Sequence, residues 1–271
     1  MKWDANKRGT VWPVIFSLTV SWVIWYFPKF IAFAGLGNDA INSQYSHANA
    51  LDFAFLIAAA VSLVMGIRGA APTHGEGVIE TPFDRIALFC GRVVMVLIVV
   101  LVSVMFYEVV ARYVFEAPTL WANELSLWVA GFIFLLSGLY AQQQRTHIRI
   151  YLIYDMFPRN VQRACDTVSA ALVVIFAFAL VWGGWGEAAA KFLRWETFGT
   201  AFDPPIPATL KPMVLLIIVI LAIQGVLNLI ADWNKGPQIH DVVDTGEIDD
   251  MIQTFGGKSA PHGQAGSKGT S

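Results

Sequence analysis

The sequence predicts an all-α membrane protein with about six transmembrane helices, and both its composition and its charge spacing support this prediction. Apolar residue types make up 56 % of the 271 residues and charged types 14 %, whereas soluble domains average about 45–50 % apolar and about 25 % charged residues. The few charged residues leave long uncharged stretches at 9–28, 53–67, 93–107, 125–144, 167–186 and 212–231.

The lengths of these stretches match the thickness of a bilayer. A hydrocarbon core about 30 Å thick takes about 20 helical residues, and four of the stretches are 20 residues long. An isolated apolar segment in lipid satisfies its backbone groups only as a helix. We therefore expect spans at 11–34, 48–67, 86–114, 120–142, 165–185 and 212–233.

The distribution of Lys and Arg predicts the orientation. With the N-terminus in the cytoplasm, thirteen of these residues fall on the cytoplasmic side, four on the opposite side and Arg112 within a helix. Because Lys and Arg concentrate in cytoplasmic loops, we expect both termini in the cytoplasm.

The first predicted span has an alternative interpretation as a secretory signal peptide. Basic residues, an apolar run and Ala32-Phe33-Ala34 resemble such a signal and its cleavage site. The run is longer than the usual 7–15 residues or so, and Pro28 and Lys29 interrupt it, so we expect the helix to be retained. N-terminal sequencing tests this prediction, and a mature chain that begins at Gly35 would reduce the number of spans to five.

Composition divides the chain into three predicted parts. Residues 69–82 are rich in Gly and Pro and predict a flexible connector, so that 1–82 forms a two-helix N-terminal extension. Residues 83–235 hold the other four spans. Residues 236–271 contain few large apolar side chains and predict a disordered cytoplasmic tail.

Several classes of function are excluded by the residues that the sequence lacks. A formal net charge of −2 gives no basic excess for nucleic acid, and none of the five histidines lies mid-span to ligate a haem. The sequence has no phosphate-binding loop or metal-ligand motif, and Cys90 and Cys165 are isolated, as small apolar core residues are. We therefore expect no enzyme activity, no cofactor and no metal.

Charged residues within or beside the predicted spans are the candidate functional residues. Glu108 and Arg112 are four residues apart, so they share one helix face and are expected to pair. Glu124 opens the next helix, where a carboxylate suits the helix dipole, and Trp121 lies at its membrane interface. We favour an architectural or subunit-contact role for these residues; a place on a transport pathway is the alternative.

A basic segment follows the fourth predicted span. Arg145, His147 and Arg149 alternate with apolar residues there, and Pro158 ends the segment. Such a segment suits the cytoplasmic membrane surface, with its cationic groups among the lipid headgroups. It equally suits a contact with another subunit, and both interpretations stay open.

The order of several short motifs resembles a known family. Tyr107-Glu108-Val109-Val110-Ala111-Arg112-Tyr113-Val114-Phe115 ends one span, Trp121 and Glu124-Leu125 begin the next, and Arg145-Thr146-His147-Ile148-Arg149-Ile150 follows it. Val181-Trp182-Gly183-Gly184-Trp185 continues the pattern. Over about 83–235 this order is similar to the small membrane subunit of tripartite ATP-independent periplasmic (TRAP) transporters.

The resemblance implies a four-helix subunit of the bacterial inner membrane that performs no chemistry itself. It implies a large permease as partner, which carries the substrate and sodium sites, and a periplasmic binding protein that delivers a small organic acid. Arg112, Glu124, His147 and Arg149 match the family positions and are expected to be architectural or interface residues. The two helices in 1–82 go beyond the family's four.

Three functions stay open on the sequence alone. The favoured one is the small subunit of a sodium-coupled organic-acid transporter. The second is an accessory scaffold of another membrane complex, photosynthetic or respiratory. The third is a stand-alone channel or carrier, although the sequence has no matching pair of Gly- or Pro-broken spans of the kind that forms a carrier's substrate site.

Overall fold

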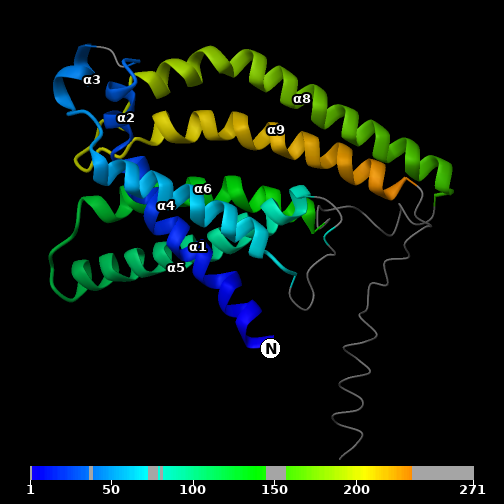
Figure 1. Cartoon of the computed structure of the whole chain (residues 1–271), viewed down its shortest axis with the longest axis horizontal. Coiled ribbons are helices and arrows are strands. Elements are labelled where there is room, and N and C mark those ends of the chain that lie inside the picture. The colour runs from blue at the N-terminus through cyan, green and yellow to red at the C-terminus, as the bar shows by residue number, and fades with distance from the viewer. Residues whose placement is uncertain (1, 37–38, 73–78, 80–81, 145–156, 234–271) are drawn as a thin grey trace, which may run out of the picture. The chain divides into compact units, whose positions relative to one another are not determined.

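The computed structural model describes residues 2–36, 39–72, 79, 82–144 and 157–233, which form helices and connecting loops and no strand (Figure 1). The helices are α1 (Lys2–Trp25), α2 (Phe27–Phe33), α3 (Asp39–Gln44), α4 (Ala50–Gly69), α5 (Pro82–Tyr113), α6 (Trp121–Gln143), α8 (Arg159–Leu193) and α9 (Ile206–Asp232). Among these, α4, α5, α6, α8 and α9 are each long and apolar enough to cross a membrane, and α1 with α2 adds a sixth span if the bent pair is counted as one. The predicted fold class is confirmed.

The first predicted span, 11–34, is not one straight helix but the two helices α1 and α2 with a bend between them. The axes of α1 and α2 differ by 56°, and Tyr26 lies between them with a backbone that is not helical. Pro28, the second residue of α2, has no N–H to donate to the preceding turn, and its ring crowds that turn. The chain therefore restarts its helix with proline in the first turn, where no donor is needed.

The last two spans are longer than hydropathy alone predicts. The predicted start of the last span, residue 212, follows Lys211, the last charged residue before the uncharged stretch, whereas α9 begins at Ile206, with Pro207 in its first turn. Similarly, α8 extends the predicted 165–185 at both ends. Hydropathy marks the part of a helix that suits lipid, and the helices continue through polar turns on either side.

Helix α5 connects the two halves of the bundle. It packs against α6, and also against α1 and α4; α6 in turn packs against α9. Ala87, Leu139 and Ile217 form a buried layer between α5, α6 and α9. Gly66 lies directly against Phe89, and Gly91 against Tyr140, so the absence of a side chain at these two positions lets α5 approach both α4 and α6 closely.

A second buried cluster joins the N-terminal helices to the connection between α8 and α9 and to the first turn of α9. Ile31, Ala32 and Ile41, from α2 and α3, pack with Trp195 and Ala208.

These helices belong to one compact unit, apart from residues 159–162 at the start of α8, which belong to a second unit together with the preceding residues 157–158. Within that second unit, Gln162 Nε2 donates to the carbonyl oxygen of Phe157 over 3.1 Å.

Candidate functional site

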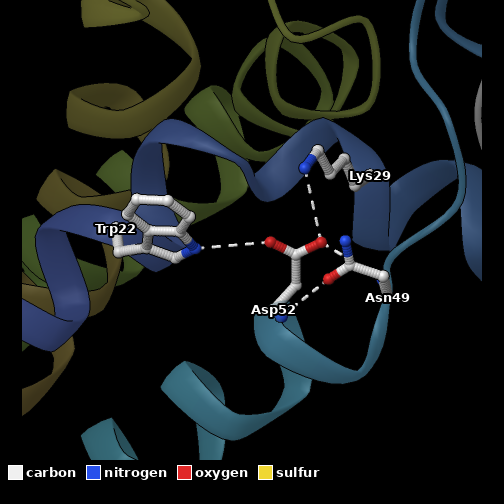
Figure 2. Close-up of polar contacts among 4 residues, drawn as sticks. All are labelled: Trp22, Lys29, Asn49 and Asp52. Atoms are coloured by element: carbon white, nitrogen blue, oxygen red, sulfur yellow. Dashed lines mark hydrogen bonds and ion pairs between the residues drawn. The ribbon is translucent and has the colours of Figure 1, made fainter.

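Asp52 is the most buried carboxylate among the described residues and joins α1, α2 and α4 (Figure 2). It is 1 % exposed. Its Oδ2 accepts from the backbone N–H of Asn49 at 3.1 Å, and Asn49 Oδ1 accepts from the backbone N–H of Asp52 at the same distance. Trp22 Nε1 donates to Asp52 Oδ1 at 3.3 Å, and Lys29 Nζ lies 3.4 Å from Oδ2 and 4.3 Å from the centre of the Tyr26 ring.

Each contact of Asp52 pairs a polar or charged group that would otherwise be buried without a partner. Asn49 and Asp52 form a capping box, which satisfies backbone donors at the start of α4. The Lys29 side chain is largely buried, and a buried charge is tolerated only beside an opposite charge and hydrogen-bonding groups. Both carboxylate oxygens are occupied by donors, so this cluster locks three helices together and offers no free acid or base.

Glu108 fixes the loop between α5 and α6. Its Oε1 accepts from Arg112 Nε at 3.0 Å and from Arg112 Nη2 at 2.6 Å. Its Oε2 accepts from the backbone N–H of Thr119 at 3.0 Å and from the Thr119 hydroxyl. Glu108 is buried, whereas the Arg112 side chain is 50 % exposed. The pairing predicted from the four-residue spacing is confirmed, and Thr119 is a further partner.

Glu124 fixes the connection between α8 and α9. It lies in the first turn of α6 as predicted, and its Oε2 accepts from Thr200 Oγ1 at 2.6 Å and from the backbone N–H of Asp203 at 3.3 Å. One turn further along α6, Trp128 Nε1 donates to Thr209 Oγ1 in α9 at 2.8 Å. The start of α6 therefore holds the start of α9 through side chains.

A buried polar layer lies at the opposite end of α5, α6 and α9. Gln224, 1 % exposed, donates from Nε2 to Asp84 Oδ1 at 3.3 Å. Asp84 precedes Ala87 by one turn of α5, whereas Gln224 follows Ile217 by two turns of α9 and Gln143 follows Leu139 by one turn of α6. The polar layer is therefore stacked on the apolar one.

The remaining predicted residues divide into those that the structure describes and those that it does not. Trp121 stacks on Tyr107, with ring centroids 5.8 Å apart. Arg145, His147 and Arg149 lie outside the described residues. Cys90 and Cys165 are free. Within the described part of the chain, no group of three or more His, Cys, Asp or Glu side chains is placed to hold a metal ion.

The residues that sequence reasoning missed are the distant partners. Thr200 and Asp203 lie 76 and 79 positions from Glu124, and Gln224 lies 140 positions from Asp84. Hydropathy marks all of these positions only as polar breaks or as single polar residues in apolar runs. Asp52 has a local signal in the sequence near the start of the second predicted span, because Asn49 lies three positions before it, as in a capped helix start.

The comparison with protein families decides the identity of the second half of the chain. Residues 101–235 match the family described as tripartite ATP-independent periplasmic transporters, DctQ component. This part of the chain is a DctQ domain. The resemblance stated from the motifs is therefore confirmed. Searches of curated proteins and of solved structures found no match.

The DctQ domain contains most of the polar contacts described above. The match begins within α5 and covers α6, α8 and α9, so it includes Glu108, Arg112 and Glu124. Helices α1–α4 lie outside it. Members of the family are small, non-catalytic components of TRAP transporters, which work with a large permease and a binding protein.

Replacing Asp52 by Ala should destabilise the N-terminal helices. The substitution leaves the Lys29 ammonium and the Trp22 N–H without their acceptor in a buried place, which should cost about 1–3 kcal/mol of unfolding free energy. Thermal unfolding of the purified chain measures the loss. Asp39→Ala is the matched control, because Asp39 is an exposed aspartate in the first turn of α3. Equal melting temperatures for the two variants would show that the Asp52 contacts contribute nothing.

Replacing Glu108 by Ala should loosen the α5–α6 loop more than replacing Arg112 by Ala. Without Glu108 the loop loses the acceptor for Thr119, whereas Glu108 keeps the Thr119 donors when Arg112 is removed. The measurement is cleavage after the exposed Glu116 in this loop by a glutamate-specific protease, with Glu116→Gln to identify the product. Faster cleavage in Arg112→Ala than in Glu108→Ala would contradict the assignment.

Proposed function

We propose that the chain is the small membrane subunit of a TRAP-type transporter and braces a large permease during sodium-coupled uptake of a small organic acid. The DctQ domain supports the transporter assignment. Sodium coupling and the organic-acid substrate follow the resemblance to that family. The proposed location is the bacterial inner membrane with both termini in the cytoplasm, which the thirteen-to-four distribution of Lys and Arg supports.

The observation that carries the bracing role is the outer face of α8. One face of α8 lies along α9, where Gly184 packs against Leu215. The opposite face is bare and apolar: Trp182 is 80 % exposed, and Leu172 and Ile175 are also mostly exposed. Gly183 lies on this side of the helix, with no atom of the described chain near the place where its side chain would be.

A bare face with an open glycine suits a partner helix. Helices in lipid gain little from burying apolar surface, because lipid tails are equally apolar, and they associate through close packing at small residues. Gly183 and Gly186, which is also open, let a helix of the permease approach the α8 backbone. Trp182, directly before Gly183, provides a large side chain to pack against that helix.

An accessory role in a different membrane complex is the second candidate. The observation that favours it is the presence of α1–α4, which lie outside the DctQ match. Purification of the tagged chain from its own membranes in mild detergent separates the candidates. A stoichiometric large permease supports the transporter role, and a photosynthetic or respiratory complex supports the accessory role.

Replacing Gly183 by Leu should weaken the association with the permease. A leucine there prevents close helix approach without altering any contact within the described chain, so the amount of co-purified permease should fall several-fold. Gly69→Leu is the control, because Gly69 is similarly open but lies at the end of α4. Undiminished recovery of the permease with Gly183→Leu would place the interface elsewhere.

A further inference from the structure

We propose that the groove between α8 and α9 binds one phospholipid with an anionic headgroup. Its acyl chain lies in the groove, and its phosphate lies at Arg163, near the beginning of α8. This site lies on the face of α8 that is directed toward α9, so it does not depend on a contact between the outer face and a permease.

The groove has a volume of about 470 Å³ and an entirely apolar lining. Ala177, Phe178 and Val181 line it from α8, and Val219, Ala222 and Val226 line it from α9. The two alanines are buried, and their short side chains leave the space that larger residues would fill. A little further along the helices, Gly184 meets Leu215 and the groove closes.

An apolar chain is the occupant that this lining selects. Water needs two to four polar partners in a cavity, and the groove offers none. An unfilled groove forfeits the dispersion contacts of all the atoms along its walls. Within a bilayer, the flexible apolar groups available to restore those contacts are acyl chains.

Arg163 supplies the charged end of the site. Its guanidinium carbon lies 5.6 Å from the centre of the Trp233 ring, and its Nε is buried without a hydrogen-bond partner. No ion pair of Arg163 is formed among the described residues. The nearest carboxylates along the two helices are those of Asp166 and Asp232. Each of these residues has an interaction within the chain, while Asp232 Oδ1 is buried without a hydrogen-bond partner.

A phosphate oxygen satisfies the unpartnered Nε–H of this guanidinium. Arginine binds phosphate oxygens through charge-assisted hydrogen bonds, and basic sites between transmembrane helices bind anionic lipid headgroups. Trp233 follows the last residue of α9, and tryptophan at a span end is typical of the headgroup region. Charge complementarity therefore selects an anionic phospholipid over a free hydrocarbon.

The spacing along α8 fits one molecule. Arg163 precedes Val174, the first α8 residue of the groove, by eleven residues, which is about 16 Å of helix. A phospholipid with its phosphate at Arg163 therefore passes its glycerol and upper chain along the helices and places the deeper part of one chain in the groove.

Native mass spectrometry of the full-length chain, extracted in mild detergent, tests the acyl site. The wild-type chain should retain one phospholipid. Ala177→Phe fills the groove and should lower lipid occupancy at least about tenfold, the equivalent of 1.4 kcal/mol. Ala179→Phe is the matched control, because Ala179 is exposed on α8 and lies about 200° around the helix from Ala177. Equal lipid occupancy in the two folded variants would overturn the proposal.

The same two variants separate this proposal from the proposed function. Ala179 lies on the outer face of α8, so Ala179→Phe should reduce permease recovery and leave the lipid bound, whereas Ala177→Phe should do the opposite. A photo-crosslinker at Val181 should capture lipid in native membranes. Capture of a protein helix there would show that a partner subunit occupies the groove, and the lipid site would be rejected.

A charge variant tests the headgroup without altering the groove, so it also serves if Ala177→Phe does not fold. The wild-type chain, exchanged into vesicles of equal phosphatidylglycerol and phosphatidylethanolamine, should retain phosphatidylglycerol preferentially. Arg163→Gln should lower that preference about fivefold, the effect of one cationic residue near a lipid surface. Arg194→Gln, an exposed residue just beyond the other end of α8, should not. The same headgroup preference in wild-type and Arg163→Gln chains would overturn the anionic assignment.

Discussion

A carboxylate that leaves water must find its donors within the chain, and in this bundle that requirement fixes the connections between helices. Asp52 takes donors from α1, from α2 and from the residue before α4, and Glu108 takes them from its own helix and from the loop that follows. Glu124, which stays partly exposed, takes donors from the α8–α9 connection. All three lie at the same end of the bundle, where α4 and α6 begin and α5 ends. The middles of the helices stay apolar, while this end is held by polar contacts.

The N-terminal helices α1–α4 are built into the same structure as the DctQ domain. Phe16 of α1 packs edge-on against Phe89 of α5, with ring centroids 5.4 Å apart. At the end of α1, Trp25 stacks on Phe202 in the α8–α9 connection at 5.5 Å, and Phe27 stacks on Trp195 at 5.3 Å. The extra helices thus occupy one side of α5 and also hold the α8–α9 connection, which Glu124 fixes from α6. Helix α8 is consequently more accessible to a partner than α5, α6 or α9.

The sequence predicts contacts within one helix well and contacts between helices poorly, for a physical reason. The spans follow from hydropathy, and the Glu108–Arg112 pair follows from helical periodicity, because both are local properties. The bend at Tyr26 has a local cause in Pro28, but residues 9–28 contain no charged residue, so hydropathy alone marks one span there. The donors of Asp52 and Glu124 depend on which helices become neighbours, and apolar helices in lipid carry little pattern that specifies their neighbours. The groove is equally hidden, because Ala177 and Ala222 are ordinary residues of a transmembrane helix until the two helices are placed together.

Helix α8 shows how a membrane helix can remain largely uncovered. In water, an apolar helix with one bare side would lose the burial on which its stability depends, whereas in lipid its backbone hydrogen bonds are internal and its side chains are already solvated. The end of α8 is anchored, by Phe192 against Phe27 and by ion pairs of Lys191 with Glu196 and of Glu187 with Lys211. Its middle rests on α9 alone, across a groove. Leaving this stretch uncovered therefore costs the chain little. One face of α8 can keep small, open residues against which a helix from outside the chain packs, and the other can keep an apolar groove that a lipid chain fills.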